Sequence, residues 1–114
     1  MATGYPDFSY PLLGISNTIN PGTINTSGNI GAYTEEEVDA TAGDITRTLP
    51  AASTHRGYAF KIQKTDSGGY VVNIAAGPGD QILVSGGPVS SVTLRSQAEY
   101  IWLTSAGGTL WYEG

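Results

Sequence analysis

The stretch Tyr58-Ala59-Phe60-Lys61-Ile62-Gln63-Lys64 decides the fold class of this 114-residue chain more clearly than any other. Aromatic or aliphatic residues stand at positions 58, 60 and 62, and a lysine and a glutamine stand at positions 61 and 63. Because successive side chains of a β-strand point to opposite faces of the sheet, this alternation predicts a half-buried strand over residues 58–64.

A second strand is predicted over Glu99–Thr104, where both faces carry large side chains. Ile101 and Leu103 share one face, and Tyr100 and Trp102 share the other. Two apolar faces are typical of a strand that is covered on both sides. We therefore expect Tyr100 and Trp102 to be buried in the core or in an interface.

After residue 33 the sequence predicts short strands separated by glycine-rich turns. Glycine marks these turns because it takes the positive φ values that tight turns need. The predicted turns are Asp66-Ser67-Gly68-Gly69, Gly77-Pro78-Gly79-Asp80, Gly86-Gly87-Pro88 and Ala106-Gly107-Gly108. The predicted strands are Thr34–Asp39, Asp44–Leu49, Tyr58–Lys64, Tyr70–Ala75, Gln81–Val84, Val89–Leu94, Glu99–Thr104 and Thr109–Tyr112. Evenly spaced short strands predict an all-β fold, a small antiparallel sandwich or barrel-like domain over residues 34–114.

The composition agrees with strands joined by tight turns. The chain has 16 glycines and 6 prolines, and 13% of its residues are charged. The run Glu35–Ala40 is the one stretch rich in helix formers, and Gly43 soon ends it. A mass of 11.9 kDa is that of one domain and leaves no room for a separate catalytic domain.

The charge balance argues against several partners. Five Lys and Arg residues are scattered among ten Asp and Glu, for a net charge of −5, whereas nucleic-acid binding needs clustered cations. No apolar run approaches the roughly 18 residues that span a bilayer. The absence of a secretory signal predicts use without Sec export or release inside a particle. Cysteine is absent, so we expect no thiolate metal site. Taken with the charge and hydropathy patterns, this predicts no metal, cofactor, nucleic acid or membrane partner.

Residues 1–33 are predicted to form an extended N-terminal arm. Its first part is rich in aromatic residues and proline, and Asp7 is the single charge among residues 1–34. Large apolar patches mark interfaces, so we expect its apolar residues to contact a partner or a neighbouring subunit. These residues are Tyr5, Phe8, Tyr10, Leu12, Leu13, Ile15, Ile19, Ile24 and Ile30. The alternative is that the arm folds back as an edge strand of its own domain.

The rest of the chain, from Thr34 to Tyr112, resembles β-modules of bacteriophage virions that occur in fibres, spikes and head-decoration (cement) proteins. The residues that carry the resemblance are Thr48-Leu49-Pro50-Ala51-Ala52, Gly57, the strand end Ile62–Asp66, Asn73-Ile74, Glu99, and Gly107-Gly108 ahead of Trp111-Tyr112. The resemblance implies a non-enzymatic structural protein that assembles as a homotrimer. A chain this short resembles a decoration protein more than a fibre, which implies a place on the capsid surface and the major capsid protein as partner.

Arg47 departs from the pattern of these modules, which have an aliphatic residue at this position. It shares a face with Ile45 and Leu49, and a buried arginine needs an acidic partner. We therefore expect Arg47 at a subunit boundary, in a trimer interface with Tyr100 and Trp102. The alternative is an edge position from which the charged end reaches water.

Two other functions remain open. A receptor-binding module of a fibre or spike would present exposed aromatic residues, such as Tyr100 and Trp102, to a host surface glycan, although aromatic residues more often pack in a core or interface. A glycan-cleaving enzyme would need paired carboxylates. Asp66 and Glu99 are the residues to test, but neither has an evident partner in the sequence.

Three polar motifs are not predicted to form sites. Ser53 and His55, two residues apart, do not make a catalytic triad. Glu35-Glu36-Glu37 with Asp39 lacks the spacing of an EF-hand, and alternate glutamates of a strand point to opposite faces. Gly77-Pro78-Gly79-Asp80 lacks the lysine of a phosphate-binding loop.

Overall fold

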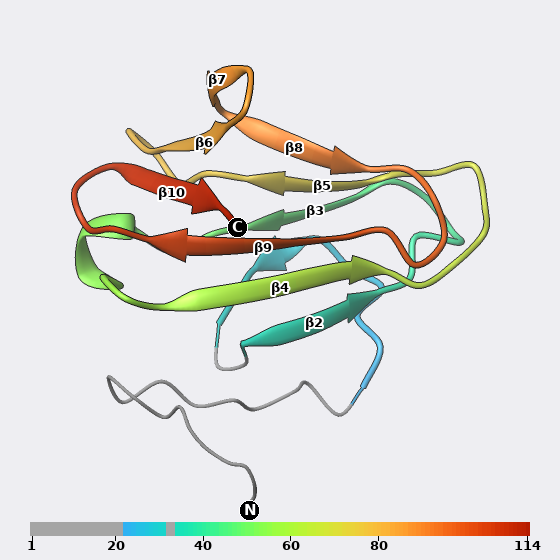
Figure 1. Ribbon diagram of the computed structural model, residues 1–114. Helices are drawn as coiled ribbons and strands as arrows, with labels where there is room; N and C mark the ends of the chain where they lie inside the picture. Colours follow the sequence, from blue (N-terminus) through green and yellow to red (C-terminus); the bar gives the residue numbers. More distant parts are fainter. Residues whose placement is uncertain (1–21, 32–33) are drawn as a thin grey trace, which may run out of the picture.

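The computed structural model describes residues 22–31 and 34–114, in which nearly all regular secondary structure is short β-strands (Figure 1). The strands are β1 (Gly28–Asn29), β2 (Glu35–Val38), β3 (Ile45–Thr48), β4 (Ala59–Lys64), β5 (Val72–Ala75), β6 (Gln81–Val84), β7 (Gly87–Val89), β8 (Ser91–Leu94), β9 (Tyr100–Ser105) and β10 (Leu110–Glu113). A short 3-10 helix spans Ala52–Thr54. The all-β fold is thereby confirmed, and every predicted strand overlaps an observed one.

One of the predicted turns is misplaced. The sequence predicts a turn at Gly86-Gly87-Pro88, but the two-residue turn falls at Ser85-Gly86, and Gly87–Val89 forms β7. β7 pairs with β6 at the edge of its sheet. Proline lacks the N–H that a central strand needs but is tolerated in an edge strand, so Pro88 does not end the pairing.

The strands form two sheets that face each other as a sandwich. The four-stranded sheet has the order β1-β3-β5-β8, and the six-stranded sheet has the order β2-β4-β9-β10-β6-β7. Both sheets are mixed, because the pairs β1–β3, β3–β5, β2–β4 and β6–β10 are parallel. The prediction of an antiparallel fold is therefore wrong for these pairs. Within the described ranges neither sheet closes into a barrel.

The order of the strands along the chain explains three of the four parallel pairs, β1–β3, β2–β4 and β3–β5. From β1 to β6, successive strands lie in alternate sheets, so the chain returns to the same sheet two strands later and runs in the same direction (Figure 1). Parallel strands need a crossover connection, and here the strand of the opposite sheet supplies it in place of a helix. Turn residues do not reveal whether a connection makes a hairpin or crosses to the other sheet.

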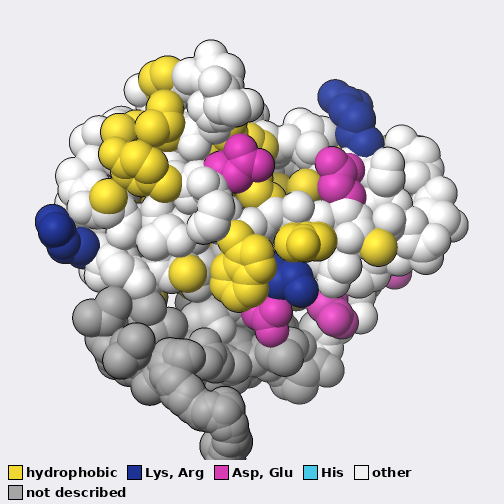
Figure 2. Space-filling view, viewed as in Figure 1, with side chains coloured by type: hydrophobic (Ala, Val, Ile, Leu, Met, Phe, Trp, Pro, Cys, Tyr) yellow, Lys and Arg dark blue, Asp and Glu magenta, His cyan; other side chains and the backbone are white. Residues whose placement is uncertain are grey.

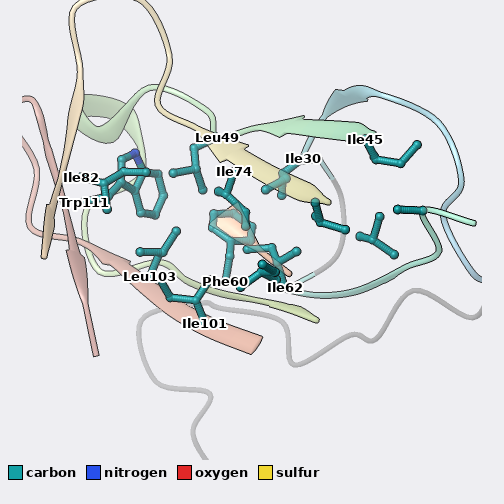
Figure 3. Packing of buried hydrophobic residues seen from close by; sticks show 14 of the residues in the cluster. Ile30, Ile45, Leu49, Phe60, Ile62, Ile74, Ile82, Ile101, Leu103 and Trp111 are labelled. Atoms are coloured by element: carbon teal, nitrogen blue, oxygen red, sulfur yellow. The ribbon is translucent and has the colours of Figure 1, made fainter. Parts of the chain in front are cut away.

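A single hydrophobic core fills the space between the sheets (Figure 3). Ile45, Val72 and Ile74 reach it from the four-stranded sheet. Trp111 of β10 is fully buried, and its ring centroid lies 5.5 Å from that of Phe60. Its Nε1 donates a hydrogen bond of 3.2 Å to the carbonyl oxygen of Pro50. The indole thus buries a large apolar area while its polar group keeps a partner.

Residues 22–31 belong to the sandwich. β1 pairs with β3, and Ile24 forms a parallel bridge with Val38 of β2 through main-chain hydrogen bonds of 2.9 and 2.7 Å. Ile30 is 3% exposed and lies in the core. The boundary predicted at residue 33 therefore does not separate these residues from the domain, and they follow the alternative of an edge strand that folds back. An apolar segment next to the body in sequence buries its isoleucines there at a small loop-closure cost.

Candidate binding surface

The outward face of the six-stranded sheet exposes three large aromatic side chains. Tyr100 and Trp102 of β9 and Tyr112 of β10 are 55%, 39% and 41% exposed. Figure 2 views this face and shows hydrophobic side chains gathered on it. Ile101 and Leu103 of the same strand point inward and are buried. The expectation that both faces of β9 are covered is therefore wrong for the single chain.

The strand register places the three aromatic residues in one row. Tyr100 and Trp102 are two positions apart on β9, which separates their Cα atoms by about 7 Å. Tyr112 lies opposite Thr104, and is therefore diagonal to Trp102 at about 7–8 Å. β9 is hydrogen-bonded to β4 on one side and to β10 on the other. The backbone beneath the row is therefore held from both sides.

A polar hollow adjoins the aromatic row. Trp102 lies opposite Lys61 of β4, and Tyr100 lies opposite Gln63. The Lys61 ammonium is 3.6 Å from the Glu35 carboxylate and 5.0 Å from the centre of the Tyr100 ring. The hollow has a volume of about 210 Å³, and its described lining residues are Glu35, Glu36, Glu37, Lys61 and Gln63. Aromatic faces and hydrogen-bonding side chains therefore lie side by side on this sheet.

The outward face of the four-stranded sheet has the opposite character. Its residues are small and uncharged, namely Thr46, Thr48, Asn73, Ala75, Ser91 and Thr93. The register sets Thr46, Asn73 and Thr93 in one row, and Thr93 Oγ1 donates to Asn73 Oδ1 at 2.9 Å. A flat partner can approach this face without burying a charge.

Arg47 of β3 lies inside the sandwich, with a side chain that is 9% exposed. Its Nε and Nη2 donate to the two carboxylate oxygens of Glu36 in β2, each at 2.9 Å. Nη2 also donates to the Asn29 carbonyl at 2.9 Å, and Nη1 donates to the Thr26 carbonyl at 3.3 Å. The acidic partner predicted for a buried arginine is confirmed. It belongs to the same chain, so Arg47 needs neither a subunit boundary nor an exposed edge.

The residues predicted to form one trimer interface do not share a surface. Arg47 points into the sandwich from β3, whereas Tyr100 and Trp102 point outward from β9. Among the predicted arm contacts, Ile30 lies in the core and Ile24 packs against it. The others lie outside the described residues, namely Tyr5, Phe8, Tyr10, Leu12, Leu13, Ile15 and Ile19.

Lys64 is a second buried cation. It is the last residue of β4, and its side chain points into the sandwich. Its Nζ donates to Asp66 Oδ2 at 2.8 Å and to the Asp66 carbonyl at 2.9 Å. The N–H groups of Ala40 and Gly68 also donate to the Asp66 carboxylate, at 2.8 and 2.9 Å. The hydrogen bond from Lys64, helped by these two N–H groups and opposed by burial, lowers the pKa of Asp66 to about 2. The sequence signal was a lysine at an inward strand position with an aspartate two residues later.

The remaining polar residues of the sequence analysis, His55, Glu99 and the run Glu35-Glu36-Glu37, have defined positions in the fold. His55 Nδ1 lies 2.9 Å from Thr54 Oγ1 and 3.0 Å from the Ala51 carbonyl, at the exposed end of the 3-10 helix. Glu99 accepts hydrogen bonds from two main-chain N–H groups of the preceding turn, and these lower its pKa. Glu35 and Glu37 point outward from β2, and Glu36 points inward.

Neither a metal site nor a relative adds to this picture. Within residues 22–31 and 34–114, no three His, Asp or Glu side chains are arranged to hold a metal ion. In the same ranges there is no helix with the length and apolar character that crossing a bilayer requires. No protein-family model, curated protein or solved structure matches the chain. The chemistry of its own surfaces is therefore the basis for assigning a function.

Proposed function

We propose that this chain is a non-enzymatic structural protein of a bacteriophage virion, a homotrimeric decoration (cement) protein on the capsid surface. The β-sandwich would self-associate, and the residues before Gly22 would bind the major capsid protein across neighbouring capsomers. A protein that binds the assembled shell and not its dispersed subunits stabilises the shell by mass action. The resemblance to phage β-modules and the single charge among the first 34 residues support this assignment.

The fastening of residues 22–31 to the sandwich is the observation that carries the proposal. Arg47 donates to the carbonyl oxygens of Thr26 and Asn29, and Ile30 is buried in the core. A segment that binds across neighbouring capsomers must remain attached to its own β-sandwich when the shell is under load. Hydrogen bonds to a buried guanidinium, combined with a buried isoleucine, provide such an attachment. The chain before Gly22 is thus joined to the body at a fixed point beside β2.

The outward face of the four-stranded sheet supports self-association. The cores of protein interfaces are depleted of charged residues, and the row Thr46, Asn73 and Thr93 carries no charge. The six-stranded sheet is less suited, because Glu35, Lys61 and other charged groups lie on its outward face. We therefore assign the trimer contact to the four-stranded sheet.

Native mass spectrometry of the full chain tests the oligomer. We expect a species of three times the 11.9 kDa chain mass. Thr46→Lys places a charge in the middle of the proposed contact and is expected to yield monomers. Thr104→Lys, the matched change on the outward face of the six-stranded sheet, is expected to keep the trimer. A wild-type monomer, or equal dissociation of both variants, contradicts the assignment.

Removal of residues 2–21 tests the role of the arm. The truncation stops before Gly22, because residues 22–31 complete the sandwich. We expect the truncated trimer to lose co-sedimentation with expanded phage heads while it retains its mass and its β-sheet circular dichroism. Undiminished occupancy of the heads would refute the role of these residues in shell binding.

A further inference from the structure

The aromatic row and the polar hollow beside it form one surface that the proposed shell contacts do not use. Tyr100, Trp102 and Tyr112 supply aromatic faces, and the hollow next to them supplies carboxylate, amide and ammonium groups. We propose that this surface binds a neutral oligosaccharide, whose rings lie along the aromatic row and whose hydroxyl groups enter the hollow.

The aromatic row suits the apolar faces of sugar rings. One face of a pyranose presents several C–H groups, and the negative face of an aromatic π-system attracts such weakly positive hydrogens. Because Tyr100, Trp102 and Tyr112 follow one another at about 7–8 Å, they can contact successive rings of a chain. Their backbone lies on two adjacent, hydrogen-bonded strands, so little conformational entropy is lost on binding.

The hollow suits the hydroxyl groups at the edges of the same rings. A hydroxyl both donates and accepts, and the hollow offers both kinds of partner. Glu35 and Glu37 supply acceptor oxygens, Lys61 supplies donors, and Gln63 carries an amide. Trp102 and Tyr100 stand directly opposite Lys61 and Gln63 in the register of β9 and β4. A ring stacked on either aromatic residue therefore has polar groups beside its edge.

The charges of the chain argue against a second copy as the occupant. Two of the five cationic side chains, Arg47 and Lys64, are buried and bound to acidic groups of their own chain. Lys61 already lies beside Glu35 within the hollow. Only Arg56 and Arg95 remain to neutralise a facing surface. Two copies joined through this face would bury several carboxylates with too few cations, which is costly.

The same charges set the class of saccharide. Glu35 and Glu37 present carboxylates to the hollow against one lysine, because Glu36 points inward and is paired with Arg47. A sulfated or carboxylated sugar would meet like charge there and lose affinity. A neutral sugar brings no charge, and its hydroxyl groups donate to carboxylates. The surface therefore selects neutral saccharides over acidic ones.

The test is a titration of the full chain with cellohexaose, chitohexaose and maltohexaose, followed by NMR chemical shifts and tryptophan fluorescence. Trp102 is partly exposed and Trp111 is fully buried, so a change in emission reports on the proposed site. At least one of the three is expected to bind with a Kd on the order of 1 mM and to shift the amide signals of β9 and β4. A sulfated hexasaccharide is expected to bind more weakly.

Two variants separate the site from general surface binding. Trp102→Ala is expected to weaken binding by about tenfold or more, as for an aromatic anchor at the centre of a contact. Tyr70→Ala removes another tyrosine that is half exposed but lies outside the row, and is expected to leave the affinity unchanged. Trp102→Phe keeps an aromatic ring and should therefore retain most of the binding. It replaces Trp102→Ala as the test variant if Trp102→Ala does not fold.

Any one of the following results would overturn the proposal. The first is that none of the neutral hexasaccharides shifts signals of this face at millimolar concentration. The second is equal weakening by Trp102→Ala and Tyr70→Ala, or tighter binding of the sulfated probe. The third is concentration-dependent association of the chain alone that Trp102→Ala abolishes, because the face would then bind a second copy. The Thr46→Lys experiment concerns the opposite sheet, so the two proposals can fail separately.

Discussion

Arg47 and Lys64 are both buried cations, but the parts of the chain that hold them differ. Arg47 binds groups 11 to 21 positions away in the sequence, in β2 and in residues 22–31. Lys64 binds groups two to four positions away, in the loop that follows its own strand. The first cation joins the two sheets and the N-terminal segment, and the second closes a local turn.

This difference predicts how strongly the removal of each cation should lower the stability of the fold. Arg47 provides both hydrogen bonds to the Glu36 carboxylate among the described residues. Asp66 also accepts from the N–H groups of Ala40 and Gly68, so its carboxylate keeps partners without Lys64. A buried charge that loses its one partner is more costly than a charge that keeps others. The long-range contact should therefore dominate stability.

The largest effect is expected for Arg47→Ala. The change leaves the Glu36 carboxylate buried without its cation and removes the donors to Thr26 and Asn29. We expect a loss of about 3–5 kcal/mol in the free energy of unfolding, measured in urea. Arg95→Ala, at an exposed arginine, is the control and should change stability by about 0.5 kcal/mol or less. Equal losses in both variants would remove the distinction between the two kinds of arginine.

The double variant Glu36→Leu with Arg47→Met should recover much of this loss. A buried ion pair is often replaced by apolar residues of similar size at little cost, because no charge is left without a partner. The carbonyl groups of Thr26 and Asn29 still lose their donor, so hydrogen exchange of the Ile30 amide should become faster. A double variant as unstable as Arg47→Ala would show that the pair itself, and not the residual charge, is essential.

A smaller, pH-dependent effect is expected for Asp66→Asn. The pKa of Asp66 is lowered from 3.8 to about 2 in the folded chain. Its ionised form therefore contributes stability above pH about 4, and this contribution is lost as the pH falls toward 2. The variant should be less stable than wild type at pH 7, and the gap between them should close between pH about 4 and 2. Thermal unfolding at several pH values measures it, and a gap independent of pH would contradict the assignment.

The smallest effect is expected for Glu35→Gln, at the partly exposed ion pair with Lys61. Such pairs contribute about 0–1 kcal/mol, because water and salt screen them and two flexible side chains must be ordered. The loss should shrink further in high salt, whereas that of Arg47→Ala should persist. A salt-independent loss as large as that of Arg47→Ala would place Glu35 among the essential acidic groups.

Local patterns predicted much of the fold. The alternation over residues 58–64 identified β4 because the side-chain period of a strand depends only on its own backbone. The shared face of Arg47 and Ile45 indicated that this arginine, if buried, needs an acidic partner; the partner is present, but within the chain and not at the predicted subunit boundary. In contrast, Tyr100 and Trp102 were expected to be covered and are exposed. Alternation divides a strand into two faces but does not reveal which neighbours cover each face.

The amino-acid sequence by itself determined most of the β-strands and turns and the kind of partner that a buried charge needs, because each depends on a few adjacent residues. Only the tertiary structure decided that strands alternate between two sheets and pair in parallel. It likewise decided that Glu36 is the partner of Arg47 and that the three aromatic residues form one row beside an acidic hollow. These features join residues far apart in the chain, and their pairing depends on how all the strands pack at once.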